Sequence, residues 1–255
     1  MRNVAKPAFD DSHSTMRIHT DFKMGFIRQV AMWSLTIGLP SFAYSAEEVP
    51  SAKAILKSVR VAQSAQNMTV TGKLRAGGKS IPFTLTIDGD TVRWDFTEPA
   101  QSLLLRLGAN DSRLEEIGKG GSTKITGAKF DDKVRDSDMS YEDLSMRFLY
   151  WPKAEVEGEQ TMVLTKCWIV RVEPAAKNDS QYGKVKLWIS KAEGALMQAE
   201  AYDHDGKFAR RFKVLSGQKT DAGFWMLKQM RIEAATNTGR ADATPTYLEI
   251  DKPKS

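Results

Sequence analysis

The sequence predicts a mainly β protein built on one large, curved antiparallel sheet. Three observations support this prediction. Apolar and polar residues alternate through most of the chain after residue 66, turn sequences such as Asp88-Gly89 separate the alternating runs, and only two stretches carry helical spacing. Such a sheet must close on itself or have its concave face covered, because open edges and apolar surface favour aggregation. The two helical stretches are the available covers.

Composition bounds the possible function classes. The chain has 255 residues, 41% of them hydrophobic, which suffices for a full core. Its formal net charge of +5 is spread among interspersed acidic and basic residues, a pattern that does not predict a nucleic-acid partner. Cys167 is the only cysteine, so stability must come from the core and not from an internal disulfide. No composition break or repeat divides residues 46–255, which we expect to form a single domain.

Residues 1–45 are predicted to be an N-terminal extension and a secretory signal peptide. Arg28 precedes an apolar run over residues 30–39, and small residues follow up to Ser45 and Ala46, where cleavage is expected. The apolar run is too short to anchor the chain in a bilayer. We therefore expect the remainder to be exported.

The remaining chain reads as one helix followed by a series of strands. Ile55, Leu56 and Val59 share one face of an amphipathic helix predicted over residues 50–66. About eleven or twelve strands should follow. In the first half they cover residues 68–75, 83–87, 92–96, 102–107 and 114–117, with a loop carrying a short strand over 118–135. In the second half they cover residues 154–164, 165–173, 183–190, 195–203, 207–216, 223–235 and 245–250.

A second helix is predicted over residues 140–150, in the middle of the strand series. Ser140 and Asp143 have the spacing of an N-cap pair. Tyr141, Leu144 and Phe148 follow as one apolar stripe, and Pro152 marks the end. These three residues are predicted to cover the hollow of the sheet as a lid.

Residue chemistry argues against an enzyme. His204 is the only histidine after the leader, and it lies in a predicted turn, so a histidine-based triad or metal site is not expected. The acidic run from Asp136 to Glu142 begins like a calcium loop but has Tyr141 where the loop requires glycine. We expect no catalytic residues, no metal and no cofactor.

Apolar surface remains as the candidate binding feature. Methionine and tryptophan are frequent in the predicted strands, and both suit a surface that accepts flexible lipid chains, although ordinary core packing is the more common explanation for any one of them. The predicted lining residues are Trp94, Phe96, Leu103, Leu105, Met162, Leu164, Trp168, Met226 and Met230.

Several stretches together resemble a known family. The exported start, the 50–66 helix, Val92-Arg-Trp-Asp-Phe96, Asp136-Ser-Asp-Met-Ser-Tyr-Glu-Asp-Leu144 and Leu187-Trp-Ile-Ser190 are similar to the periplasmic outer-membrane lipoprotein-sorting proteins, the LolA/LolB-like group. The resemblance implies a half-open antiparallel β-barrel with helices covering its concave face and a hydrophobic cavity for acyl chains. No cysteine lies at the cleavage point, so the chain resembles the soluble carrier of that group.

The resemblance also implies a function. A soluble, monomeric periplasmic carrier would bind acyl chains of lipoproteins or similar lipids and pass them toward the outer membrane. An inner-membrane transporter would be the donor and an outer-membrane receptor the acceptor. An envelope lipid sensor, or an accessory protein of a membrane exporter, remains the alternative.

Overall fold

The computed structural model describes residues 48–64, 67–220, 223, 225–236 and 244–253. The chain divides into two units, Met1–Glu47 and Glu48–Ser255, and the features below belong to the second. The predicted signal peptide lies outside the described residues and stays a prediction.

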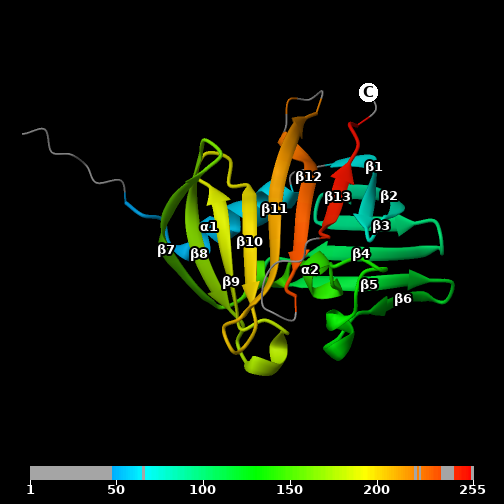
Figure 1. The fold of residues 1–255 in the computed structure, drawn as a ribbon, viewed down its shortest axis with the longest axis horizontal. Helices are drawn as coiled ribbons and strands as arrows, with labels where there is room; N and C mark the ends of the chain where they lie inside the picture. The colour runs from blue at the N-terminus through cyan, green and yellow to red at the C-terminus, as the bar shows by residue number, and fades with distance from the viewer. Residues whose placement is uncertain (1–47, 65–66, 221–222, 224, 237–243, 254–255) are drawn as a thin grey trace, which may run out of the picture. The chain divides into compact units, whose positions relative to one another are not determined.

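The described residues form one antiparallel sheet of thirteen strands, where the sequence predicted about eleven or twelve (Figure 1). The first six strands are β1 (Asn67–Ala76), β2 (Lys79–Asp88), β3 (Thr91–Phe96), β4 (Gln101–Leu107), β5 (Ser112–Gly118) and β6 (Gly121–Lys124). The other seven are β7 (Lys153–Met162), β8 (Thr165–Glu173), β9 (Lys184–Ser190), β10 (Leu196–Tyr202), β11 (Phe208–Lys219), β12 (Trp225–Ala234) and β13 (Thr246–Ile250).

Two meanders make up this sheet, and β1 and β13 join them. The strand order is β6-β5-β4-β3-β2-β1-β13-β12-β11-β10-β9-β8-β7. Figure 1 shows the strands of the two meanders running in different directions, so the sheet bends where β1 meets β13. Within the described ladders β6 and β7 have no strand on their outer sides, and the sheet is open. This is the half-open, mainly β architecture that the sequence predicted.

The junction of the meanders depends on a glycine. Gly72 in β1 lies opposite both Phe83 in β2 and Ile250 in β13. A Cβ atom at this position would lie 2.4 Å from the carbonyl oxygen of Glu249 and 2.6 Å from the ring of Phe83. Only glycine allows the Phe83 ring to cross the β1 backbone at this distance.

The helix α1 (Ala52–Ser64) begins and ends within the predicted range 50–66. Ser51 precedes it, and its hydroxyl accepts a hydrogen bond from the backbone N–H of Ala54 at 3.2 Å, which satisfies one free donor of the first turn. Ile55, Leu56 and Val59 are buried in the same core as the inner face of the sheet. The predicted apolar stripe therefore faces the sheet.

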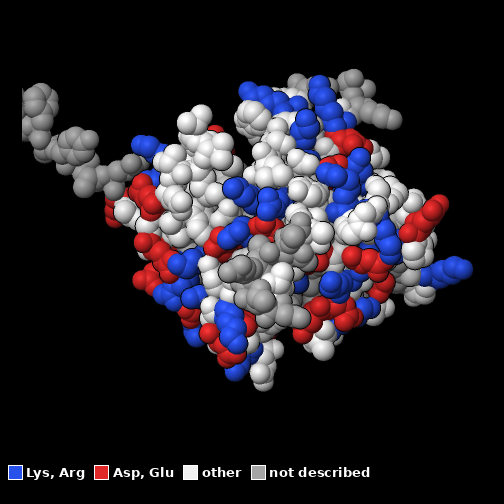
Figure 2. Space-filling model, viewed as in Figure 1, with Lys and Arg blue, Asp and Glu red and all other residues white. Residues whose placement is uncertain are grey.

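The outer face of the sheet is covered by ion pairs. Arg211 in β11 pairs with Glu200 in β10 at 2.8 Å and with Glu233 in β12 at 3.2 Å, and both acids are its direct cross-strand neighbours. Figure 2 shows acidic and basic side chains intermingled over the face in view. A mixed charged surface keeps the outer face of an open sheet in water.

Residues 125–152, which we call the cover segment, connect edge strand β6 to edge strand β7. The segment contains three short helices, η1 (Gly127–Asp131), α2 (Tyr141–Ser145) and η2 (Arg147–Tyr150). The predicted continuous helix 140–150 is wrong, because Met146 adopts a left-handed conformation (φ 49°) and divides it into α2 and η2. The predicted N-cap is confirmed: Ser140 and Asp143 form a complete capping box.

One predicted strand boundary is also wrong. The strand predicted to run to residue 164 ends at Met162, and Val163 and Leu164 form the turn before β8 with φ values of 44° and 71°. This turn carries none of the glycine, asparagine or aspartate residues that normally adopt positive φ, so the sequence offered no turn signal.

Candidate functional site

Seven of the nine predicted lining residues belong to the core or pack against it. Trp94 and Phe96 in β3, and Leu103 and Leu105 in β4, are buried, and Trp94 lies directly opposite Leu103. Trp168 in β8 and Met226 in β12 are buried in the same cluster, and Met230 is half-buried against it. The inner face of the sheet thus carries one continuous apolar surface.

The other two residues lie near the β7–β8 turn. Met162 is half-buried at the end of β7. Leu164 is 98% exposed, so its predicted place inside the sheet is wrong. It became a turn residue because β7 is shorter than the apolar pattern indicated.

The predicted lid residues cover the inner face from the cover segment. Tyr141 and Leu144 lie in α2 and Phe148 in η2, and all three are buried in the core cluster. The left-handed turn at Met146 interrupts the helix without exposing Phe148. The cover is therefore two short helices that together carry one apolar surface.

Buried polar contacts fix α2 to the second meander. One carboxylate oxygen of Asp143 accepts hydrogen bonds from the Ser140 backbone N–H at 2.7 Å and from the Ser140 hydroxyl at 2.8 Å, and it pairs with the guanidinium of Arg210 in β11. The other oxygen accepts a hydrogen bond from the Tyr182 hydroxyl at 2.7 Å. Burial raises the pKa of Tyr182 well above its usual value, so this hydroxyl stays a donor.

Further contacts attach the cover segment to both halves of the sheet. The Thr246 hydroxyl in β13 donates to the carboxylate of Asp138 at 2.9 Å and accepts from the Asp138 backbone N–H at 3.0 Å. On the other meander, the Ser112 hydroxyl in β5 donates to the carbonyl of Ser145 at 2.8 Å. The segment is held across the hollow of the sheet by hydrogen bonds to each side.

Sequence reasoning found Asp143 as a capping residue but missed its role as the partner of Arg210. A signal was present: Arg210 and Arg211 are adjacent in a strand, so one of the two must point inward and needs a buried acid. Arg211 points outward to Glu200, and Arg210 points inward to Asp143.

The described residues do not meet the requirements of a side-chain metal site or of a membrane-spanning helix. Within the described part of the chain, no group of three or more histidine, cysteine, aspartate or glutamate side chains could hold a metal ion. None of the helices that the structure describes is long and apolar enough to cross a bilayer.

A protein-family model with the description "Uncharacterized protein" matches residues 120–254, more than half of the chain. The chain belongs to this family. The matched region runs from β6 through the cover segment to the C-terminal end, so it includes Asp138, Asp143, Arg210 and Thr246. No curated protein matches the sequence.

Solved structures of LolA-like proteins and of a DUF1329 family protein share this fold. One match is an outer membrane lipoprotein-sorting protein domain from Vibrio parahaemolyticus. It has a TM-score of 0.60 and 16% sequence identity, and the match covers 80% of this chain and 91% of that one. A LolA superfamily protein from Nitrosomonas europaea matches with a TM-score of 0.58 and 14% sequence identity, over 81% of this chain and 95% of that one. A DUF1329 family protein from Desulfovibrio piger matches with a TM-score of 0.53 and 19% sequence identity, over 81% of this chain and 94% of that one. The fold of this family member is LolA-like.

Proposed function

We propose that this protein is a soluble periplasmic carrier that holds acyl chains of lipoproteins or similar lipids between the sheet and the cover segment. The observation that carries the proposal is the continuous apolar inner face under a cover that belongs to neither meander. The LolA-like fold supports it. Trp94, Phe96, Leu103, Leu105, Trp168, Met226 and Met230 would contact the chain, with Met162 at the rim.

Binding would require the cover segment to move. Tyr141, Leu144 and Phe148 now occupy the apolar surface that an acyl chain would take. An acyl chain that replaces these side chains gains about 0.8 kcal/mol of binding free energy for each CH₂ group that it buries. A long acyl chain would therefore offset both the exposure of these three side chains and the loss of the hydrogen bonds that attach the cover to the sheet. Transfer then needs only a receiver that binds the same chain more tightly, without bond chemistry.

The proposed export of the protein and transfer of the lipid follow from the leader and the fold. Residues 1–45 would direct export to the periplasm and be removed there. A membrane-embedded donor would supply the lipid and an outer-membrane receptor would accept it. The carrier itself would act as a monomer without a cofactor.

A disulfide across the cover tests the proposal. Asp138→Cys and Thr246→Cys, in a Cys167→Ala background, place two thiols where the native side chains are hydrogen-bonded. Oxidation should lock the cover onto β13 and abolish binding of a fluorescent fatty acid, and reduction of the same sample should restore it. Each sample thus serves as its own control for folding.

Equal binding in the oxidised and reduced states would contradict a moving cover. If neither state binds any fatty acid or phospholipid, and mass spectrometry of the exported protein finds no lipid, the carrier proposal fails. A stable complex with a membrane protein under those conditions would favour the sensor or accessory role.

A further inference from the structure

A pocket with charged residues in its walls lies at the end of the sheet where the cover segment meets the loop before β9. Its volume is about 850 Å³. Five segments distant in sequence form its walls: the start of β5, the end of β6 with η1, the α2–η2 region, residues 177–181 and His204. This volume is typical of small-molecule sites.

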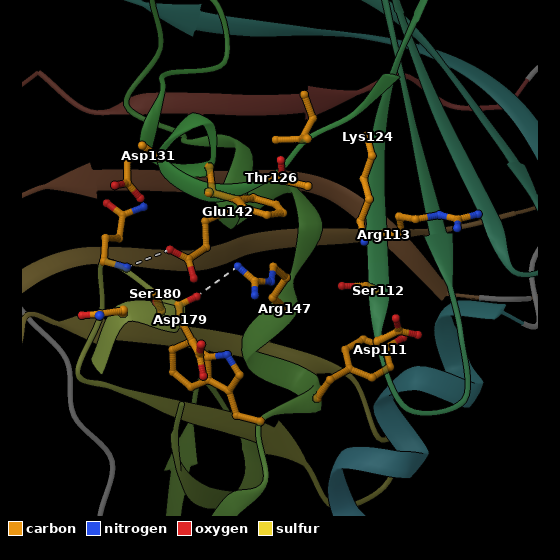
Figure 3. A pocket seen from close by; sticks show the side chains of 18 of the residues that line it. Asp111, Ser112, Arg113, Lys124, Thr126, Asp131, Glu142, Arg147, Asp179 and Ser180 are labelled. Atoms are coloured by element: carbon orange, nitrogen blue, oxygen red, sulfur yellow. Dashed lines mark hydrogen bonds between the residues drawn. The ribbon is translucent and has the colours of Figure 1, made fainter. Parts of the chain in front are cut away.

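Charged side chains of both signs line this pocket. In Figure 3, Lys124 and Asp111 lie on one side, and Glu142 and Asp131 lie on the other. Within the described part of the chain, Lys124 and Asp131 make no ion pair and no side-chain hydrogen bond. Both groups are therefore available to a ligand.

Arg147 lies between the two sides and is held in place. Its guanidinium donates to the carbonyl of Asp179 at 3.1 Å and lies 4.4 Å from the centre of the Phe130 ring. These two contacts leave the remaining N–H donors of a fixed guanidinium free for an anion.

Two buried oxygen atoms at the pocket lack partners. Glu142 is fully buried; one carboxylate oxygen accepts from the backbone N–H of Gln181 at 3.2 Å, and the other has no hydrogen-bond partner in the described structure. The hydroxyl of Tyr150 is also buried without a partner. Buried polar atoms are nearly always paired, so the Glu142 oxygen without a partner points to a missing donor at this pocket.

We infer that this pocket binds a small zwitterionic group that carries an ammonium and a phosphate, the chemistry of phosphoethanolamine. The ammonium would donate to Glu142 and Asp131, and the phosphate would lie against Lys124 and Arg147. This inference goes beyond the acyl-chain proposal, because a polar pocket of this kind can bind a soluble group whether or not the inner face takes a chain.

Calorimetric titration with soluble probes tests the inference. Phosphoethanolamine should bind, and ethanolamine and inorganic phosphate should each bind at least tenfold more weakly, because each satisfies only one side of the pocket. Glu142→Gln, Asp131→Asn and Lys124→Ala should each weaken phosphoethanolamine at least tenfold. Asp131 and Lys124 are rim residues, so their variants remain informative if Glu142→Gln does not fold.

Matched controls are exposed residues of the same type outside the pocket. Lys119→Ala and Asp90→Asn should leave the affinity unchanged. Absence of phosphoethanolamine binding, or inorganic phosphate binding as tightly as phosphoethanolamine, would overturn the zwitterion assignment. Unchanged affinity in both rim variants would also overturn it.

A competition experiment identifies the source of the group. If vesicles containing phosphatidylethanolamine displace phosphoethanolamine and phosphatidylglycerol vesicles do not, the ligand is a lipid headgroup. If neither displaces it, the ligand is the free compound. Both outcomes retain the zwitterionic site, and neither depends on fatty-acid binding by the inner face.

Discussion

Asp143 attaches the cover segment to the second meander through several buried polar contacts. It closes the capping box with Ser140, accepts from Tyr182 and pairs with Arg210, which lies 67 residues further along the chain. Its side chain is fully buried and that of Arg210 is 13% exposed. A charge pair withdrawn from water in this way is costly to form but far more costly to break, since removing one partner leaves the other charge uncompensated.

Asp143→Ala should therefore lower the free energy of unfolding by about 3 to 5 kcal/mol, measured by urea denaturation. The double variant Asp143→Ala/Arg210→Met should lose clearly less than the sum of the two single losses. Lys79→Ala, which removes a solvent-exposed ion pair with Asp136 in the same region, is the control and should leave stability almost unchanged. Additive losses in the double variant would contradict a direct Asp143–Arg210 coupling.

Glu142 should make stability depend on pH. Burial raises the pKa of Glu142, although the hydrogen bond from Gln181 opposes this shift. The folded state therefore holds the Glu142 proton to higher pH than the unfolded state. The contribution of Glu142 to the free energy of unfolding is fully present below the ordinary glutamate pKa. It is lost as pH rises through the pKa that Glu142 has in the folded state. The melting temperature of Glu142→Gln relative to wild type should thus rise with pH across this window.

The control for this pH series is Glu48→Gln, at an exposed glutamate before α1. Its melting temperature should differ from that of wild type by a constant amount at every pH. A Glu142→Gln difference that is flat or falls with pH would show that burial does not dominate at this carboxyl group.

At the scale of elements, the cover segment combines weak helices with strong attachments. The helix α2 has five residues, too few to be stable alone. It persists because its capping box satisfies the first turn and because Tyr141 and Leu144 are buried. Tertiary contacts thus stabilise the cover, and loss of those contacts would release it as a unit.

Ser140→Ala should remove the cap and cost about 1 kcal/mol. The Ser140 hydroxyl accepts from the Asp143 N–H at 3.3 Å and from the Gln181 side chain at 3.1 Å. Hydrogen exchange should accelerate over residues 136–152 before it does so in the strands. Ser51→Ala, the matching position before α1, is the control and should accelerate exchange only in α1. Uniform acceleration throughout the sheet would contradict a cover that opens separately.

At the scale of the whole domain, the β1–β13 pairing decides whether the two meanders form one sheet. The strands that join are the first and last of the chain, so all other strand pairs are local and this one alone closes a long loop. The free energy of that closure comes from the inner-face contacts around Gly72, Phe83 and Ile250.

Gly72→Ala should disturb this junction, because the added Cβ would overlap the Glu249 carbonyl and the Phe83 ring. Overpacking of this kind costs about 1 to 3 kcal/mol. The measurement is urea denaturation, with Gly120→Ala as the control, since a Cβ at Gly120 meets no atom within 4 Å. Equal stabilities of the two variants would show that β1 and β13 can separate slightly without loss.

Much of this architecture could be predicted from the sequence. The alternation in residues 92–96 and the apolar run in residues 102–107 were sufficient to predict β3 and β4, and the spacing of Ile55, Leu56 and Val59 to predict α1. Ser140 and Asp143 predicted the cap of α2. These features depend on residues close together in the chain, where side-chain periodicity and capping chemistry act directly.

Other features were decided by the tertiary structure. The Val163–Leu164 turn contradicts local preference, and the pairing of β7 with β8 imposes it. Met146 takes a left-handed conformation because the cover must follow the inner face and keep Phe148 buried. The partners Asp143–Arg210 and Asp138–Thr246 lie 67 and 108 residues apart, and local patterns carry no information about which distant side chains will meet. The sequence by itself therefore determined the series of strands, the helix α1 and the cap of α2. Only the folded sheet decided how its cover is attached, because attachment depends on contacts that exist once β11 and β13 are in place.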